Sequence, residues 1–163
     1  MGETKANASY LTPSPAILKW ITKTHILLYE KTGGWLGSAI WQRGEAGHGL
    51  LRTMNVLLLS TVGRKSGLTR KVALPYFQYE ERVFVIASNA ASEKNPDWYE
   101  NLAATPEARV QLGAAKLRVT ARPLSGDEYE RLWRVHVAAW PRWSLYATQT
   151  TRRIPMVELT FHG

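Results

Sequence analysis

The sequence contains no cysteine among its 163 residues. Disulfide bonds, thiolate metal sites and a thiol nucleophile are therefore excluded, and the absence fits a reducing cytoplasm. No apolar run is long enough for a signal peptide or a membrane-spanning helix. We therefore expect a cytoplasmic protein, with no metal in its functional site.

Acidic residues are scarce, because 13 Asp and Glu face 21 Lys and Arg and leave a formal net charge of +8. This surplus favours an anionic partner, and charge alone does not choose among nucleic acid, anionic lipid and a polyanionic small molecule. Half of the surplus lies in residues 64–71, which hold four cations and no acid. Because nucleic-acid tracks usually spread over several phosphates, this concentration favours a discrete anion site, and we expect no nucleic-acid partner.

The cationic turn directly follows the apolar run 57–59 and is bracketed by Gly63 and Gly67. These glycines permit positive φ, and we expect them to let backbone N–H groups face one concavity. The side-chain donors of the turn are Arg64, Lys65, Ser66 and Arg70. The turn predicts a phosphate site, and the alternative is a solvated basic hairpin loop.

Periodicity and turn residues indicate five or six strands with helices between and around them. Strands are expected at about 53–61, 70–79, 82–88, 110–112, 116–123 and 156–161. Helices are expected at 15–32, from Asn95 as N-cap to about Ala104, and after Ser125 with a break at Pro141. The absence of βαβ alternation predicts a small closed or partly closed antiparallel barrel. We expect a single domain over 15–163 after a mobile tail, 1–14.

Two amphipathic segments have more than one interpretation. The helix expected at 15–32 is basic, and it either packs on the domain or lies on a membrane surface as a peripheral contact. Near the C-terminus, Trp140, Trp143 and Tyr146 recur every three residues and share one side of a helix. Such a stripe is either core or the wall of a flat pocket that excludes water.

Four motifs in order give the chain a recognisable pattern. They are residues 61–70 (TVGRKSGLTR), the strand end Ala87-Ser88, residues 93–102 (EKNPDWYENL) and Arg152-x-Ile154-Pro155. Over about residues 15–160 this order resembles the deazaflavin-dependent nitroreductase and oxidoreductase family of actinobacteria. The resemblance implies an α+β fold, a split β-barrel of the FMN-binding-like kind with flanking helices. It also implies coenzyme F-420, an 8-hydroxy-5-deazaflavin with a phosphate and a polyglutamate tail, as hydride donor.

The resemblance also implies roles for individual residues. The cofactor-binding set is Arg64, Lys65, Ser66, Gly67, Arg70, Pro75, Tyr76, Ser88, Asn89, Ala90, Ala91, Asn95, Trp98 and Asn101. Trp140, Trp143 and Tyr146 correspond to substrate positions, and Tyr146 and Ser88 are the candidate catalytic residues, with Tyr146 or water as proton donor. Relatives often carry Lys-Gly-Gly where this chain has residues 89–91, so one charge and two glycines are missing here.

The leading hypothesis is an oxidoreductase that passes a hydride from reduced F-420 to a small conjugated acceptor, an enone, a quinone or a nitroaromatic. A second enzymatic hypothesis is the same barrel using FMN. A non-enzymatic hypothesis is an F-420 carrier or sequestering protein whose pocket is filled by Trp140 and Trp143. A nucleic-acid or anionic-lipid binding module is supported by charge alone. The oligomeric state is left open.

Overall fold

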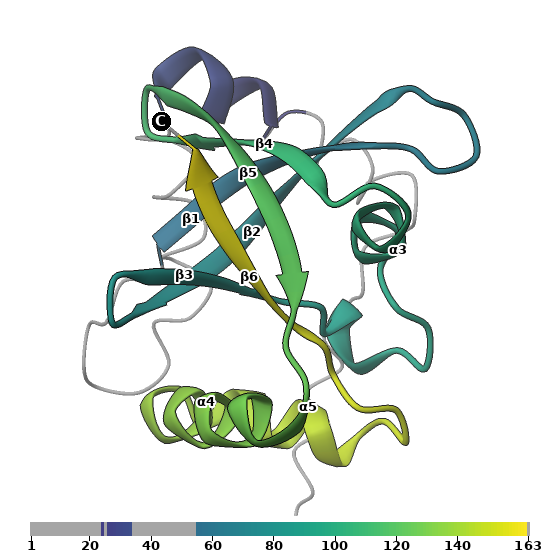
Figure 1. Cartoon of the computed structure of the whole chain (residues 1–163), viewed down its shortest axis with the longest axis vertical. Coiled ribbons are helices and arrows are strands. Elements are labelled where there is room, and N and C mark those ends of the chain that lie inside the picture. The colour runs from purple at the N-terminus through teal and green to yellow at the C-terminus, as the bar shows by residue number, and fades with distance from the viewer. Residues whose placement is uncertain (1–23, 25, 34–54, 163) are drawn as a thin grey trace, which may run out of the picture.

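The computed structural model describes residues 24, 26–33 and 55–162 (Figure 1). The expected tail, most of the expected first helix and the segment 34–54 lie outside the described residues. Residues 26–32, called the N-terminal helical segment below, are helical, and Gly33 follows them with a φ of 60°. The helix stop predicted at Gly33 is confirmed.

Six antiparallel strands close into a barrel in the order β1-β2-β3-β6-β5-β4. They are β1 (Asn55–Val62), β2 (Thr69–Tyr79), β3 (Arg82–Ile86), β4 (Glu107–Leu112), β5 (Ala115–Pro123) and β6 (Met156–His162). The other elements are the short 3-10 turn η1 (Asn89–Ala91) and the helices α3 (Asp97–Ala104), α4 (Gly126–Ala139) and α5 (Arg142–Thr148). The predicted α+β barrel with flanking helices is confirmed.

The apolar run in β1 is explained by the burial of the strand on both of its faces. Side chains of a strand alternate between its two faces, so Leu57 and Leu59 point into the barrel and join its interior cluster. Val56 and Leu58 point outward and are buried against Tyr29 of the N-terminal helical segment. The Tyr29 hydroxyl donates to the Val56 carbonyl at 2.7 Å. Both faces of β1 are therefore buried, as its composition requires.

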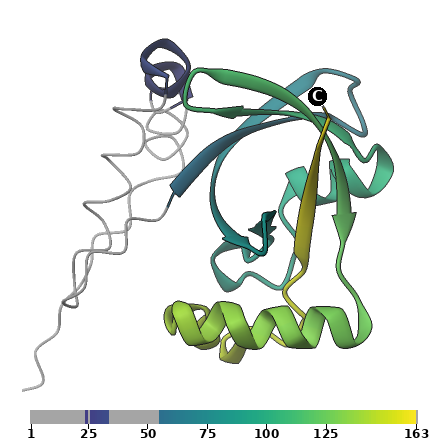
Figure 2. The same cartoon turned by 60° about the vertical axis from the view of Figure 1, so that its left-hand side comes forward.

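The helix α4 lies across one end of the barrel, and the N-terminal helical segment lies at the other (Figure 1, Figure 2). Four side chains tie α4 to the strands. The Arg82 guanidinium contacts Glu128 of α4 at 2.6 Å and Glu158 of β6 at 2.6 Å, and Arg122 contacts the same two carboxylates at 2.8 and 2.5 Å. Hydrogen bonds lower the pKa of Glu128 to about 2, and the bond from Arg122 contributes more than the bond from Arg82. This network links α4 to β3, β5 and β6.

Several predicted boundaries differ from the structure. The strand expected at 110–112 begins earlier, because β4 starts at Glu107. The strand expected to end at Ser88 ends at Ile86. The helix expected to begin with Asn95 as its N-cap begins at Asp97, with Pro96 as N-cap. The Asn95 carboxamide does not cap the helix because its oxygen accepts from Arg152 at 2.9 Å and its nitrogen donates to Glu100 at 3.0 Å.

Candidate functional site

The loop between β1 and β2 is tightly closed on itself. The Gly63 N–H donates to the Leu68 carbonyl at 2.9 Å, and the Gly67 N–H donates to the Gly63 carbonyl at 2.8 Å. A Cβ on Gly63 would lie 2.8 Å from the Ser66 hydroxyl and 3.1 Å from the Leu68 carbonyl, so a larger residue would crowd the loop, while Gly67 has a φ of 66°. The two glycines allow a compact turn that carries its cations on the outside.

The backbone of this loop does not form the expected concavity of N–H donors. The N–H groups of Ser66 and Gly67 are bonded to the Gly63 carbonyl, and the Arg64 N–H donates to the Asn101 side chain at 3.1 Å. The prediction of open backbone donors is therefore wrong for these three residues. At these three positions, only the side chains of Arg64 and Ser66 can offer donors to an anion.

Asn101 of α3 connects the loop to the barrel. Its side chain is 3% exposed, donates to the Thr61 hydroxyl at 3.1 Å and accepts from the Arg64 N–H. The guanidinium of Arg64 also reaches the same oxygen at 3.3 Å. One buried amide therefore holds the end of β1, the loop backbone and the Arg64 side chain in one arrangement.

Replacing Asn101 by alanine should lower the free energy of unfolding by about 2 kcal/mol, because the buried Thr61 hydroxyl and the Arg64 N–H lose their partner. Urea unfolding measures the change. Asn55→Ala, at the exposed start of β1, is the matched control. A loss no larger than that of the control would contradict the anchoring role of Asn101.

A cleft of about 570 Å³ lies between this loop and α3. Six of the predicted cofactor residues line it, namely Arg64, Lys65, Ser66, Arg70, Trp98 and Asn101. Five lining residues were not among the predicted site residues, namely Thr61, Gly63, Lys71, Val72 and Asp97. Trp98 is 7% exposed and also belongs to the barrel core, so it serves as packing and as cleft wall at once. We call this cavity the cationic cleft.

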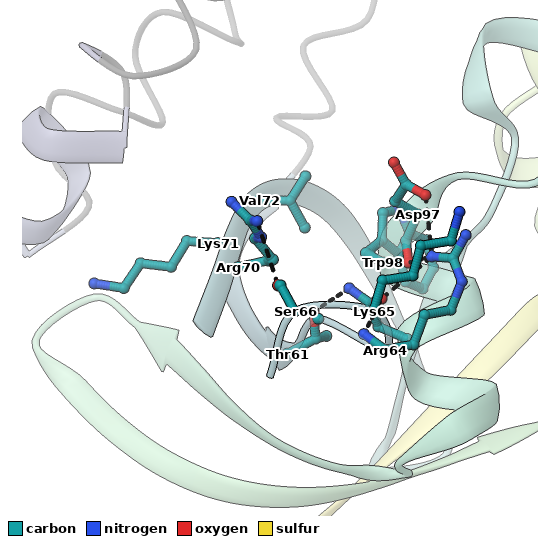
Figure 3. A pocket seen from close by; sticks show the side chains of 11 residues that line it. Thr61, Arg64, Lys65, Ser66, Arg70, Lys71, Val72, Asp97 and Trp98 are labelled. Atoms are coloured by element: carbon teal, nitrogen blue, oxygen red, sulfur yellow. Dashed lines mark hydrogen bonds and ion pairs between the residues drawn. The ribbon is translucent and has the colours of Figure 1, made fainter. Parts of the chain in front are cut away.

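The charges of the cationic cleft are unevenly paired. Arg64 contacts Asp97 at 3.0 Å, and the Asp97 side chain is 89% exposed. Figure 3 shows Lys65 close to this pair, whereas Lys71 points away toward the N-terminal helical segment, where it pairs with Glu30. Within the described part of the chain, Lys65 has no hydrogen bond or ion pair. Because exposed ion pairs are weak, an incoming anion can compete with Asp97 for Arg64.

The remaining predicted cofactor residues lie outside the lining of the cationic cleft. Gly67 is exposed on the loop, and Pro75 and Tyr76 are half-buried on β2. Burial raises the pKa of the Tyr76 hydroxyl. Ser88 and residues 89–91 form the turn η1, which packs against α5. Asn95 lies between η1 and α3, so the structure divides the predicted set between the cleft and the neighbouring loop.

The predicted substrate aromatics pack in the cluster beneath α4 and α5. Trp143 is 8% exposed, and its ring lies 5.3 Å from that of His136 and 5.6 Å from that of Tyr146. Trp140 and Tyr146 are half-buried against the same cluster. The structure therefore gives Trp143 a core role and leaves Trp140 and Tyr146 at the boundary with solvent.

Two negative findings concern the described residues. No cluster of three or more His, Asp or Glu side chains is arranged to hold a metal ion there. Across the same residues, no helix combines the length and apolar character needed to cross a membrane.

The closed barrel and its flanking helices place the protein in the split β-barrel class. A family described as F-420H(2)-dependent quinone reductase matches residues 36–160. A protein of Mycobacterium tuberculosis named F-420H(2)-dependent quinone reductase Rv1261c is 33% identical over 120 residues, which are 72% of this chain and 80% of that protein.

Two solved structures are similar to this chain in both fold and sequence. One, titled as an F-420-H2 dependent reductase (FDR-A), has a TM-score of 0.58 and 36% sequence identity. The match covers 70% of this chain and 100% of that chain. The other, titled as a domain-swapped dimer, has a TM-score of 0.60 and 32% sequence identity. The match covers 88% of this chain and 99% of that chain. The chain belongs to the F-420H(2)-dependent quinone reductase family. It is an F-420H2-dependent reductase with coenzyme F-420 as its cofactor, as the sequence motifs predicted.

Proposed function

We propose that this reductase passes a hydride from reduced F-420 to a quinone, and that the cationic cleft holds the phosphate of the cofactor. The observation that carries the proposal is the cleft itself, whose lining includes the cations Arg64, Lys65 and Arg70 and one acid, the exposed Asp97. The names of the relatives support a quinone over an enone or a nitroaromatic as acceptor.

The residues of the cleft fit a phosphate. Arg64 offers a planar fork of donors, and Lys65 offers an ammonium group without a partner among the described residues. Arg70 and the Ser66 hydroxyl lie 3.4 Å apart and form a second pair of polar groups on the same loop. Charge-assisted hydrogen bonds from such groups are the strongest that a protein can offer to a phosphate oxygen.

The acceptor would bind near η1 and α5. When bound, the reduced deazaflavin supplies the hydride. The chain has to orient the acceptor, exclude water and provide a proton, because a quinone that gains a hydride becomes a hydroquinone only after it also gains H⁺. The Tyr146 hydroxyl, half-buried on α5, is the proposed proton donor, and Ser88 beside η1 is the proposed polar contact.

An assay of F-420H2 oxidation tests this function. With the purified protein we expect F-420 to bind more tightly than FMN, and we expect turnover of a soluble quinone at least tenfold faster than that of an enone or a nitroaromatic. Tighter binding of FMN, or a faster reaction with a nitroaromatic, would contradict the proposal.

One observation favours a second candidate, the non-catalytic F-420 carrier. Trp143, one of the predicted substrate residues, is 8% exposed and packs in the core cluster beneath α5. A carrier would bind F-420 and show no turnover with any acceptor of the panel.

A further inference from the structure

The turn η1 has an unusual backbone. Three consecutive residues, Asn89, Ala90 and Ala91, have φ values of 48°, 49° and 62°. This left-handed conformation brings the Cβ of an L-residue too close to its own backbone, so it is rare outside glycine and, to a lesser degree, asparagine. Two alanines in succession keep it only where surrounding contacts impose it.

Internal hydrogen bonds of the turn are few. The Ala91 N–H donates to the Ser88 carbonyl at 3.0 Å, and the Ser92 N–H donates to the Asn89 carbonyl at 3.0 Å. Outside the turn, the Asn89 side chain donates to the Lys94 carbonyl at 2.9 Å. These three bonds are local, so they follow the shape of the turn and do not by themselves select it.

The side chain of Arg152, from the segment between α5 and β6, bonds to both ends of this turn. Its Nη2 donates to the carbonyls of Ala87 at 2.9 Å and Ser88 at 2.7 Å, just before η1. Its Nε donates to the Ser92 carbonyl at 2.7 Å, just after η1, and its Nη1 donates to the Asn95 side chain at 2.9 Å. One rigid guanidinium therefore fixes the distance between the two ends of η1.

A neighbouring contact reinforces the same connection. The Glu93 carboxylate accepts from the Thr151 N–H and from the Thr151 hydroxyl, each at 2.8 Å. These hydrogen bonds lower the pKa of Glu93, and the bond from the Thr151 backbone N–H has the largest effect. Residues 151 and 152 thus hold the segment 87–95 at several points, and η1 lies between those points.

We propose that Arg152 is a positioning residue for the cofactor, because it clamps η1 in its left-handed conformation. The inference rests on the proposed function, in which the acceptor binds near η1, and on the expectation from the sequence motifs that Ser88 and residues 89–91 bind F-420. The clamp takes the place of glycine freedom at Ala90 and Ala91, since the turn keeps a conformation that alanine alone would leave.

Amide exchange in the protein without cofactor tests the clamp directly. In Arg152→Gln, the amides of Ala91 and Ser92 should exchange at least tenfold faster than in the wild type, while the amides of β1 and β4 keep their rates. The matched control is Arg153→Gln, at the next position in the chain. It removes the same charge, and the side chain that it replaces forms an exposed ion pair with Glu130. If the amides of Ala91 and Ser92 exchange at the same rate in Arg152→Gln as in Arg153→Gln, the proposal is overturned.

Cofactor titration tests the positioning role. Arg152→Gln should raise the Kd for F-420 at least tenfold, and Arg152→Lys should do nearly the same, because one ammonium group cannot span the four acceptors. Adding Ala90→Gly, at an exposed position, to Arg152→Gln should recover at least threefold of the lost affinity, because glycine adopts the left-handed conformation without the clamp. Full affinity in Arg152→Lys, or no recovery with glycine, would show that Arg152 acts through its charge or through general stability.

The two proposals fail in different ways. If the wild type binds no F-420, the proposed function is wrong, and amide exchange still reports whether Arg152 clamps η1. If the wild type binds F-420 and Arg152→Gln binds it equally well, the positioning role alone is wrong.

Discussion

Replacing Arg64 and Lys65 together by alanine should raise the Kd for F-420 by about 100-fold or more. Each residue is placed to give the phosphate a charge-assisted hydrogen bond, and two such bonds are together worth about 3 kcal/mol or more. A titration that follows the deazaflavin fluorescence measures the change. The free energy of unfolding should fall little, because the Arg64 N–H keeps its bond to Asn101 and the lost pair with Asp97 is an exposed one.

A matched control separates binding from net charge. Lys116→Ala with Arg118→Ala removes the same two charges from exposed positions of β5, away from the cationic cleft. We expect this pair to change Kd less than threefold. Equal losses in the two double variants would show that the long-range field of the protein attracts the cofactor and that the cleft is not its phosphate site.

Lowering the pH from 7 to 4 should cost the protein about 3 kcal/mol of stability through His136 alone. This side chain is 2% exposed and lies against Phe77, Trp133 and Trp143, and neither ring nitrogen has a hydrogen-bond partner among the residues that the structure describes. Burial lowers its pKa from 6.5 to about 4. The unfolded chain therefore binds this proton more readily than the folded protein does, and the stabilisation present above pH 6.5 is lost as the pH falls toward 4.

Urea unfolding between pH 7 and pH 4 measures this dependence. In His136→Leu, a change of similar volume, the slope over that range should be shallower by about the same 3 kcal/mol, and stability at pH 7 should change by about 1 kcal/mol or less. His162→Phe, at an exposed position of β6, is the control. A slope that stays unchanged in His136→Leu would show that the buried ring is not the group responsible.

Much of the fold could be predicted because its signals are local. The apolar run of β3, the alternation in β5 and the spacing of Tyr129, Leu132 and His136 on α4 each depend on residues a few positions apart. Closure of the barrel depends on pairings such as Val83 with Leu159, between strands far apart in the chain. Such pairings leave no local pattern, and closure was therefore predicted only as one of two alternatives.

The candidate site divides in the same way. The cationic loop was visible because glycines and cations are adjacent in the sequence, and its residues do line the cleft. Asp97 was missed as a partner of Arg64, because nothing near residue 97 indicates that α3 docks on this loop. Thr61 was missed because its role depends on the buried amide of Asn101. The expected N–H concavity was wrong because the loop satisfies those donors internally.

The amino-acid order alone thus determined the turns, the strand and helix periods, and the concentration of positive charge in one loop, since each depends on near neighbours. The contacts that complete the site came with folding in three dimensions. Arg64 meets Asp97 across 33 positions and Arg152 meets Ser88 across 64, and only the closed barrel brings such residues together. A donor and an acceptor so far apart in the chain become a pair when the whole core holds both segments, and no short stretch encodes that.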